Sequence, residues 1–258
     1  MKPCSFTIFC KHAEAHSPIV DDLCQSLSDN GFYIDDEHPR VIIVLGGDGS
    51  LLNAFHTFGF DGQYIMINTG HLGFFADYRM DDYRFLIQDM LEKEPSIEEM
   101  PLLNTTINGK KESCVSDIAI QSERTCQLAL SINDVPFTEV RCNGIVIGTN
   151  TGSTGYLLSL GSPVSIHCNH VYQYHMIAPV VNKLFLNPIN SAILSKDDIL
   201  TINIKDGDCV VLLDGIPMGR VEACAIKVEL TDTMVQMIHF KDVNQISRMH
   251  RAIQGEED

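Results

Sequence analysis

A run of five apolar residues that leads directly into a glycine-rich turn constrains the fold of this chain most strongly. Residues 41–45 (Val-Ile-Ile-Val-Leu) do not alternate with polar residues, which is typical of a strand covered on both faces in a parallel sheet. The turn at residues 46–50 (Gly-Gly-Asp-Gly-Ser) follows at once, and apolar side chains at helical spacing over residues 51–58 predict a helix behind it. Because open α/β sheets bind ligands outside the carboxyl ends of their strands, this turn is a candidate ligand site.

The turn combines backbone donors with one carboxylate. Gly46, Gly47 and Gly49 let backbone N–H groups approach phosphate oxygens, and the N-terminus of the following helix favours negative charge. Asp48 would repel phosphate, so two roles suit it: accepting a proton from an attacking hydroxyl, or holding a magnesium ion that accompanies nucleotide phosphates. A purely structural turn is the alternative.

Basic residues and common nucleotide motifs are missing around this turn. No lysine or arginine lies between Arg40 and Arg79, so bound phosphates would depend on backbone donors, a metal ion or basic groups from elsewhere in the fold. The P-loop pattern does not occur, and Leu52 occupies the position of the third glycine in the Rossmann fingerprint. These absences disfavour a standard P-loop kinase and a hydride-transfer dehydrogenase, and we expect magnesium dependence.

The chain changes its pattern near residue 100. Before it, short apolar strands alternate with helical patterns, one of which begins with Ser17 as N-cap and Pro18 as its first residue and closes at Gly31. After it, short strands are predicted over residues 105–107, 115–121, 127–132, 145–148, 200–204, 210–213, 225–230 and 234–240. We therefore expect an α/β domain (residues 1–100), an all-β domain (residues 101–240) and a terminal segment with a weak helix (residues 241–258). The charged, proline-flanked residues 92–101 form the expected boundary.

Charge and cysteine usage exclude several classes of protein. The 34 acidic residues outnumber the 18 lysines and arginines, and the formal net charge of −16 argues against binding to nucleic acid or other polyanions. No apolar stretch approaches the ~18 residues that span a bilayer, and the N-terminus lacks the pattern of a secretory signal. The nine cysteines form no C-x-x-C pair, so neither a disulfide framework nor a zinc site is indicated. We expect a cytoplasmic protein with reduced cysteines.

Two further clusters contain residues suited to nucleotide binding. Residues 68–75 follow the next predicted strand, where Asn68 offers both donors and acceptors and the two phenylalanines at the end are able to stack on a base. Residues 148–162 are rich in glycines and hydroxyl groups around Tyr156, which suits contacts with ribose, base edges or phosphate. Taken alone, each cluster is equally well explained as a structural turn or a polar loop.

Three other patterns have structural explanations. Asp214 and Gly215 predict a hairpin turn, Asp81 and Asp82 predict the start of a helix, and residues 167–170 contain two histidines and a cysteine that match no standard zinc spacing.

The three clusters together, at residues 46–52, 68–74 and 151–161, closely resemble the NAD kinase family in order and spacing, over almost the whole chain. The Gly-Gly-Asp-Gly element alone is shared with lipid kinases and phosphofructokinases, so the second and third clusters carry the specificity. The resemblance implies a NAD kinase-like two-domain fold, with the site between the domains and the C-terminal segment returning to the first. It also implies transfer of the γ-phosphoryl group of ATP, or in some members of polyphosphate, to the 2′-hydroxyl of the adenosine ribose of NAD, which gives NADP.

The resemblance also assigns roles to individual residues. Asp48 matches the catalytic carboxylate that activates the 2′-hydroxyl, and no metal site built by the protein itself is implied. The implied substrate-binding residues come from all three clusters and from the β half: Gly46, Gly47, Gly49, Asn68, Leu72, Phe74, Ser116, Asp117, Asn143, Thr151, Thr154, Gly155, Tyr156, Ser159 and Ala178. Among them, Thr154 would hydrogen-bond the adenine and Ala178 would lie at the nicotinamide end. Family members form dimers or tetramers whose site borrows residues from a neighbour, and Phe185 falls in that region.

Two positions depart from the family pattern. Ser116 and Asp117 stand where the family usually has Asn-Glu, which keeps a carboxylate but loses a bidentate amide. Asn143 stands where many members have an acid before the glycine of the next strand. These departures are expected to alter the affinity for the dinucleotide or the preference between NAD and NADH.

We therefore expect an ATP-dependent NAD kinase that uses Mg²⁺, or another divalent cation, carried with ATP and forms a homodimer or homotetramer. A catalytically silent NAD-binding regulatory protein is one alternative, motivated by Ser116 and Asn143 and opposed by the intact Asp48. The other is a sugar or lipid kinase with the same Gly-Gly-Asp-Gly motif, although no segment clearly supplies the apolar pocket that a lipid requires.

Overall fold

The computed structural model describes residues 1–258 except residues 12, 71–72, 182–188, 243 and 255–258. The chain forms two compact units: unit 1 comprises Met1–Glu99 and Val235–Asp258, and unit 2 comprises Met100–Met234. Strands β6 (Ser96–Ile107) and β15 (Ala225–His239) contribute residues to both units. In the described part of the chain, no helix is both long enough and apolar enough to cross a membrane.

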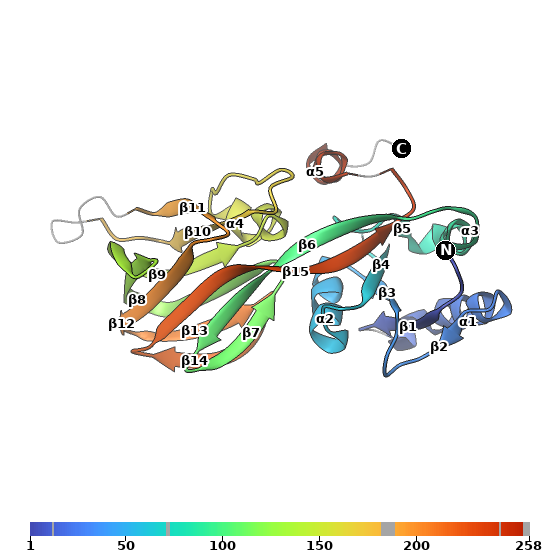
Figure 1. Ribbon diagram of the computed structural model, residues 1–258, viewed down its shortest axis with the longest axis horizontal. Coiled ribbons are helices and arrows are strands. Elements are labelled where there is room, and N and C mark those ends of the chain that lie inside the picture. Colours follow the sequence, from blue (N-terminus) through green and yellow to red (C-terminus); the bar gives the residue numbers. More distant parts are fainter. Residues whose placement is uncertain (12, 71–72, 182–188, 243, 255–258) are drawn as a thin grey trace. The chain divides into compact units, whose positions relative to one another are not determined.

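Unit 1 is built on parallel strands, as the unbroken apolar run at residues 41–45 predicts. The strand order is β2-β1-β3-β4-β15, with β5 also paired to β4, and each of these pairs is parallel (Figure 1). The elements of unit 1 are β1 (Ser5–Cys10), α1 (Ala13–Asp29), β2 (Tyr33–Ile34), β3 (Val41–Gly46), α2 (Asp48–Phe58), β4 (Gln63–Asn68), β5 (Tyr78–Arg79), η1 (Met80–Asp82), α3 (Tyr83–Glu92) and α5 (Gln245–Gln254).

Helices cover both faces of this sheet. Alternate residues of β3, at positions 41, 43 and 45, pack in one cluster with the apolar faces of α1 and α3. On the other face, α2 packs against β3, and its Phe55 contacts Tyr64 of β4 edge to face at 4.6 Å. Full burial of β3 explains why its sequence shows no polar alternation.

Helix α1 begins earlier than the sequence suggests. It starts at Ala13, so Pro18 lies inside the helix rather than at its first position. The good helix formers at positions 13–15 extend the helix toward the N-terminus and outweigh the cap signal of Ser17. The predicted end is confirmed: Gly31 has φ +87°, and Phe32 N–H donates to Leu27 O at 3.1 Å, as in a Schellman motif.

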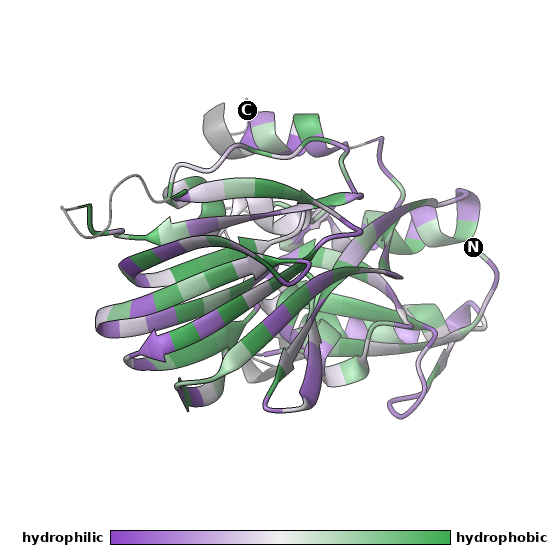
Figure 2. Cartoon of the chain, turned by 60° about the vertical axis from the view of Figure 1, so that its left-hand side comes forward, coloured by the Kyte–Doolittle hydropathy of each residue, from purple (hydrophilic) through white to green (hydrophobic). Residues whose placement is uncertain are grey.

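Unit 2 consists of antiparallel strands, which confirms the expected change to a β-rich fold. Strand β8 pairs with β9, β12 and β13, and β9 also pairs with β10. The elements that lie wholly in unit 2 are β7 (Lys110–Cys114), β8 (Asp117–Ile132), β9 (Val135–Gly148), η2 (Thr151–Thr154), α4 (Tyr156–Ser159), β10 (Val171–Ile177), β11 (Ser191–Ser195), β12 (Ile199–Asp206), β13 (Asp208–Leu213) and β14 (Ile216–Glu222). Hydrophobic and hydrophilic residues alternate along many of its strands (Figure 2). The buried hydrophobic residues form one large core, and a smaller cluster contains Leu157 of α4.

Two sequence expectations for this unit can be checked directly. The hairpin turn at Asp214 and Gly215 is confirmed, since both residues have positive φ between β13 and β14, and Asn133 and Asp134 form a similar turn between β8 and β9. Residues 96–101 of the expected boundary segment belong to strand β6, and the division between the two units falls inside this segment, between Glu99 and Met100.

Candidate functional site

The glycine-rich turn joins β3 to α2 as expected, and Asp48 is the first residue of the helix. Gly46 must lack a side chain, because a Cβ there would lie 2.2 Å from the Ser50 hydroxyl oxygen. A Cβ on Gly47 or Gly49 would meet nothing within 4 Å, so open space surrounds their backbone. The turn therefore leaves room for a ligand beside the N-terminus of α2.

The carboxylate of Asp48 is held by backbone donors from the second cluster. Phe74 N–H donates to its two oxygens at 3.0 and 3.2 Å, and Phe75 N–H donates at 3.3 Å. Burial raises the pKa of Asp48 above its ordinary value, and these N–H groups and the charge of Arg248 offset part of the rise. A fixed, half-buried carboxylate with a raised pKa is suited to accept a proton from a hydroxyl group.

Asn68 shapes the loop that carries these donors. Its side-chain amide donates to Gly70 O and its Oδ1 accepts from Gly70 N–H, both at 3.0 Å. Gly73 lies directly against this amide, since a Cβ there would be 2.7 Å from Asn68 Cγ. Asn68 thus organises the loop through both its donor and its acceptor. The predicted site residues Leu72 and Phe185 lie outside the described residues.

In unit 2, a buried carboxylate that sequence reasoning assigned only to a turn organises the Ser116 region. Asp214 accepts from the backbone N–H groups of Val115, Ser116 and Asp117 at 3.0, 2.7 and 3.2 Å. The only sequence signal is an acidic residue directly after the buried strand β13, and that signal also fits the hairpin turn that the structure confirms. Asp214 is therefore a supporting residue of the site that the sequence did not reveal.

The structure brings Ser116 and Asp117 next to the third cluster, at residues 148–162. Gly152 packs on the Ser116 backbone so closely that a Cβ would lie 2.2 Å from Ser116 O. Thr149 Oγ1 donates to Val115 O at 2.6 Å and accepts from Gly152 N–H at 3.3 Å. These contacts fix the turn η2, which contains the predicted residues Thr151 and Thr154, beside Ser116 and Asp117.

Asp117 has the electrostatics of a functional carboxylate. Burial and the negative charge of Asp214 raise the pKa of Asp117 to about 6. The hydrogen bond from Ser116 offsets part of this rise. The Ser116 hydroxyl donates to Asp117 Oδ2 at 2.9 Å. Asp117 is thus held next to Ser116 in a state that titrates close to neutral pH.

The remaining predicted residues of unit 2 lie in η2, in α4 and at its N-cap, on β9 and just after β10. Tyr156 OH accepts from Gln121 at 3.2 Å, and Ser159 Oγ donates to Tyr156 O at 2.9 Å. Asn143 lies on β9 and Ala178 directly follows the end of β10, and the residues next to them, Gly144 and Ile177, are register partners. Thr154 Oγ1 donates to Thr151 O at 3.3 Å, and Gly155 starts α4 as its N-cap.

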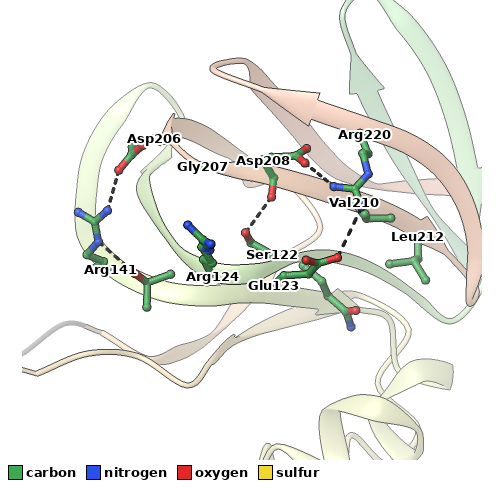
Figure 3. A pocket seen from close by; sticks show the side chains of 12 residues that line it. Ser122, Glu123, Arg124, Arg141, Asp206, Gly207, Asp208, Val210, Leu212 and Arg220 are labelled. Atoms are coloured by element: carbon green, nitrogen blue, oxygen red, sulfur yellow. Dashed lines mark hydrogen bonds and ion pairs between the residues drawn. The ribbon is translucent and has the colours of Figure 1, made fainter.

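A hollow of about 760 Å³ lies next to Gln121 and shows no signal in the sequence (Figure 3). It opens where residues 122–125 of β8 bulge against Asn143 of β9. Arg141 pairs with Asp206 at 2.6 Å, and Arg220 pairs with Asp208 on the other side. Gln121 lines the hollow and also donates to Tyr156 OH, so the hollow lies next to Tyr156.

No group of three or more metal-ligating side chains occurs among the described residues. Asp48 is the acidic side chain of the glycine turn, and a single carboxylate suits a hydrated magnesium ion whose other ligands are water and nucleotide phosphates. The residues present thus fit a cation that arrives with the nucleotide.

Comparison with known proteins gives a consistent result over the whole chain. Residues 11–95 match the ATP-NAD kinase N-terminal domain, and residues 117–222 match the ATP-NAD kinase C-terminal domain. The chain is 27% identical over 248 residues to the NAD kinase of Lactobacillus gasseri, covering 92% of this chain and 93% of that protein. It is 26% identical over 255 residues to the NAD kinase of Enterococcus faecalis, covering 95% and 96%.

Solved structures share the fold. An NAD kinase from Archaeoglobus fulgidus in complex with ATP matches with a TM-score of 0.78 and 19% identity, over 99% of this chain and 100% of that one. A yeast NADH kinase complexed with NADH matches with a TM-score of 0.77 and 17% identity, over 100% of this chain and 89% of that one. The expected α/β and β-rich architecture is confirmed.

Proposed function

The chain belongs to the NAD kinase family, and we propose that it is an ATP-dependent NAD kinase in which Asp48 is the general base. The observation that carries the proposal is the Asp48 carboxylate, fixed by two backbone N–H groups at the end of β3 with its pKa raised. In the reaction, Asp48 accepts the proton of the adenosine 2′-hydroxyl as that oxygen bonds to the γ-phosphorus of ATP. The bond between the γ-phosphorus and the bridging oxygen breaks, and ADP leaves.

Residues of unit 2 supply the dinucleotide-binding groups in this proposal. Asp117 is suited to accept hydrogen bonds from a ribose or an adenine amino group, and the hydroxyls of Thr151, Thr154 and Tyr156 are suited to base and ribose edges. Support comes from the contacts that hold Asp117 and η2 together around Ser116 and Gly152. The serine at position 116 offers one hydroxyl in place of an amide, so this half of the site makes fewer hydrogen bonds than the usual family pair.

Magnesium enters with the nucleotide in this proposal. When bound, the cation would neutralise charge on the transferring phosphoryl group, and Asp48 and the backbone of the glycine turn are the residues available to it. The protein is also proposed to act as a homodimer or homotetramer in the cytoplasm, on the basis of the family resemblance.

The test separates binding from chemistry at Asp48. Purified protein and its Asp48→Asn variant are assayed for NADP formation from NAD, ATP and magnesium, and NAD binding is measured by calorimetry. We expect turnover to fall by about 10²–10⁴-fold, because proton acceptance is lost, while NAD affinity changes little.

Asp61→Asn, in an exposed loop, is the matched control and should retain full turnover. Unchanged turnover in Asp48→Asn would remove Asp48 from the mechanism. NAD binding without any turnover in the wild type would favour the silent regulatory alternative, and binding of a sugar phosphate or lipid in place of NAD would favour the other kinases.

A further inference from the structure

The C-terminal helix α5 carries an arginine that is buried almost completely. Arg248 is 2% exposed, although arginine is among the residues most rarely found inside proteins. Its Nη2 donates to both oxygens of Glu98, at 2.6 and 2.7 Å. A buried cation with this geometry is fixed in one orientation.

A histidine and a second carboxylate complete the surroundings of Arg248. His239 bonds through Nδ1 to Asp77 at 2.9 Å and through Nε2 to Glu98 at 3.0 Å. Burial favours the neutral ring, but the hydrogen bonds and charges of Asp77 and Glu98 outweigh it and raise the pKa of His239 to about 9. The ring is therefore an imidazolium at neutral pH. The four side chains form a largely buried network with two positive and two negative charges, in which only Glu98 is partly exposed, at 32%.

The guanidinium of Arg248 lies on the segment that holds Asp48. Its Cζ is 5.5 Å from the centroid of the Phe74 ring and 5.6 Å from that of Phe75, both within the range of a cation–π contact. The backbone N–H groups of the same two residues donate to the Asp48 carboxylate. Phe74 and Phe75 thus connect Arg248 to Asp48.

We propose that Arg248 is a positioning residue for Asp48: it holds the Phe74–Phe75 segment so that its two N–H groups orient the carboxylate, and its charge acts on that carboxylate from α5. This inference rests on the proposed function, in which Asp48 is the base. It also identifies a basic group that the sequence around the glycine turn lacks. The Asp77–His239–Glu98 network fixes Arg248 and takes no direct part in the reaction.

The shape of the guanidinium matters as well as its charge. A planar guanidinium is able to lie on aromatic rings while one of its nitrogens binds Glu98, whereas the compact ammonium of lysine is not suited to both contacts at once. Arg248→Lys should therefore keep the charge but lose part of the orientation, and Arg248→Met should lose both.

The experiment compares Arg248→Met, Arg248→Lys and Arg251→Met with the wild type. Arg251 lies on the same helix, and none of the described ring contacts involves it, so its variant controls for charge removal from α5. We measure kcat, KM for NAD, thermal stability, the pH profile of kcat, and hydrogen exchange of the Phe74 and Phe75 amides.

We expect kcat of Arg248→Met to fall by about 10- to 100-fold, with KM for NAD within about twofold of the wild type, and Arg248→Lys to be intermediate. The acid limb of the profile should move to higher pH in Arg248→Met, because the other groups acting on Asp48 are the neutral N–H groups of Phe74 and Phe75. Their amides should exchange faster, and Arg251→Met should show none of these changes.

Two results would overturn the inference: a folded Arg248→Met with kcat within about twofold of the wild type, or unchanged exchange at the Phe74 and Phe75 amides. The exchange measurement needs no activity, so it tests the positioning role even if the protein makes no NADP. Absence of NADP in the wild type would instead contradict the proposed function.

Discussion

Replacement of Asp214 with alanine would remove the acceptor of three backbone N–H groups at once. These groups, on Val115, Ser116 and Asp117, donate at 2.7–3.2 Å to a carboxylate that is 6% exposed. A buried donor left without a partner costs about 1–3 kcal/mol, so three of them give about 3–9 kcal/mol. Because water is able to enter part of the vacated space, we expect the free energy of unfolding to fall by about 3–6 kcal/mol.

Asparagine at position 214 keeps the shape of the aspartate side chain and removes its charge. Asp214→Asn keeps one oxygen, but its amide group places a donor against at least one of the three N–H groups. We expect about half the loss caused by alanine. Because the charge of Asp214 helps to raise the pKa of Asp117 to about 6, the asparagine variant should also lower that pKa.

Urea unfolding followed by circular dichroism measures the decrease in the free energy of unfolding. The pH dependence of NAD affinity reports the titration of Asp117. Asp232→Ala is the control, since its side chain is 88% exposed and pairs only with Lys196 among the ion pairs described. A surface pair of this kind contributes less than about 1 kcal/mol. If the free energy of unfolding fell no more in Asp214→Ala than in this control, the assignment of Asp214 as the acceptor of the three N–H groups would be refuted.

Two further predictions concern packing and pH. Gly152→Ala should lower the free energy of unfolding by about 1–3 kcal/mol, because the added Cβ would lie 2.2 Å from the backbone oxygen of Ser116. In Gly155→Ala the nearest atom would be 3.5 Å from the added Cβ, so the free energy of unfolding should fall less in the same urea titration. The buried network of unit 1 should weaken at high pH. The pKa of His239 rises from 6.5 to about 9 on folding, so its contribution of up to about 3 kcal/mol is complete below pH 6.5 and is lost as the pH passes 9. The stability difference between the wild type and His239→Gln should therefore shrink from pH 6.5 to pH 10, and a constant difference would contradict this assignment.

Local sequence patterns predicted the parts of the fold that depend on local chemistry. Residues 41–50 indicated a buried parallel strand, a turn and a helix, and the structure has β3, Gly46–Gly47 and α2 at these positions. The helix signal of Ser17 and Pro18 was misleading because favourable residues upstream extend α1. Strands β10 and β14 were not predicted, since polar residues and a proline interrupt their patterns.

The supporting residues of the site were not predictable in the same way. Asp214 acts on residues almost a hundred positions earlier, and its local sequence indicates only the turn that it also forms. The network around Arg248 joins side chains from positions 77, 98, 239 and 248 that share no sequence pattern. Such residues become visible only when the fold brings them together, whereas Asp48 stands in a motif whose chemistry is local.

The product that the purified protein forms tests the proposed reaction directly. With NAD, ATP and magnesium supplied, an NADP-specific dehydrogenase detects the dinucleotide product and a coupled assay measures ADP. If Asp48 is the base of an NAD kinase reaction, NADP and ADP form in equal amounts and Asp48→Asn forms neither above background. Release of ADP without NADP, or NADP formation that survives in Asp48→Asn, would contradict it.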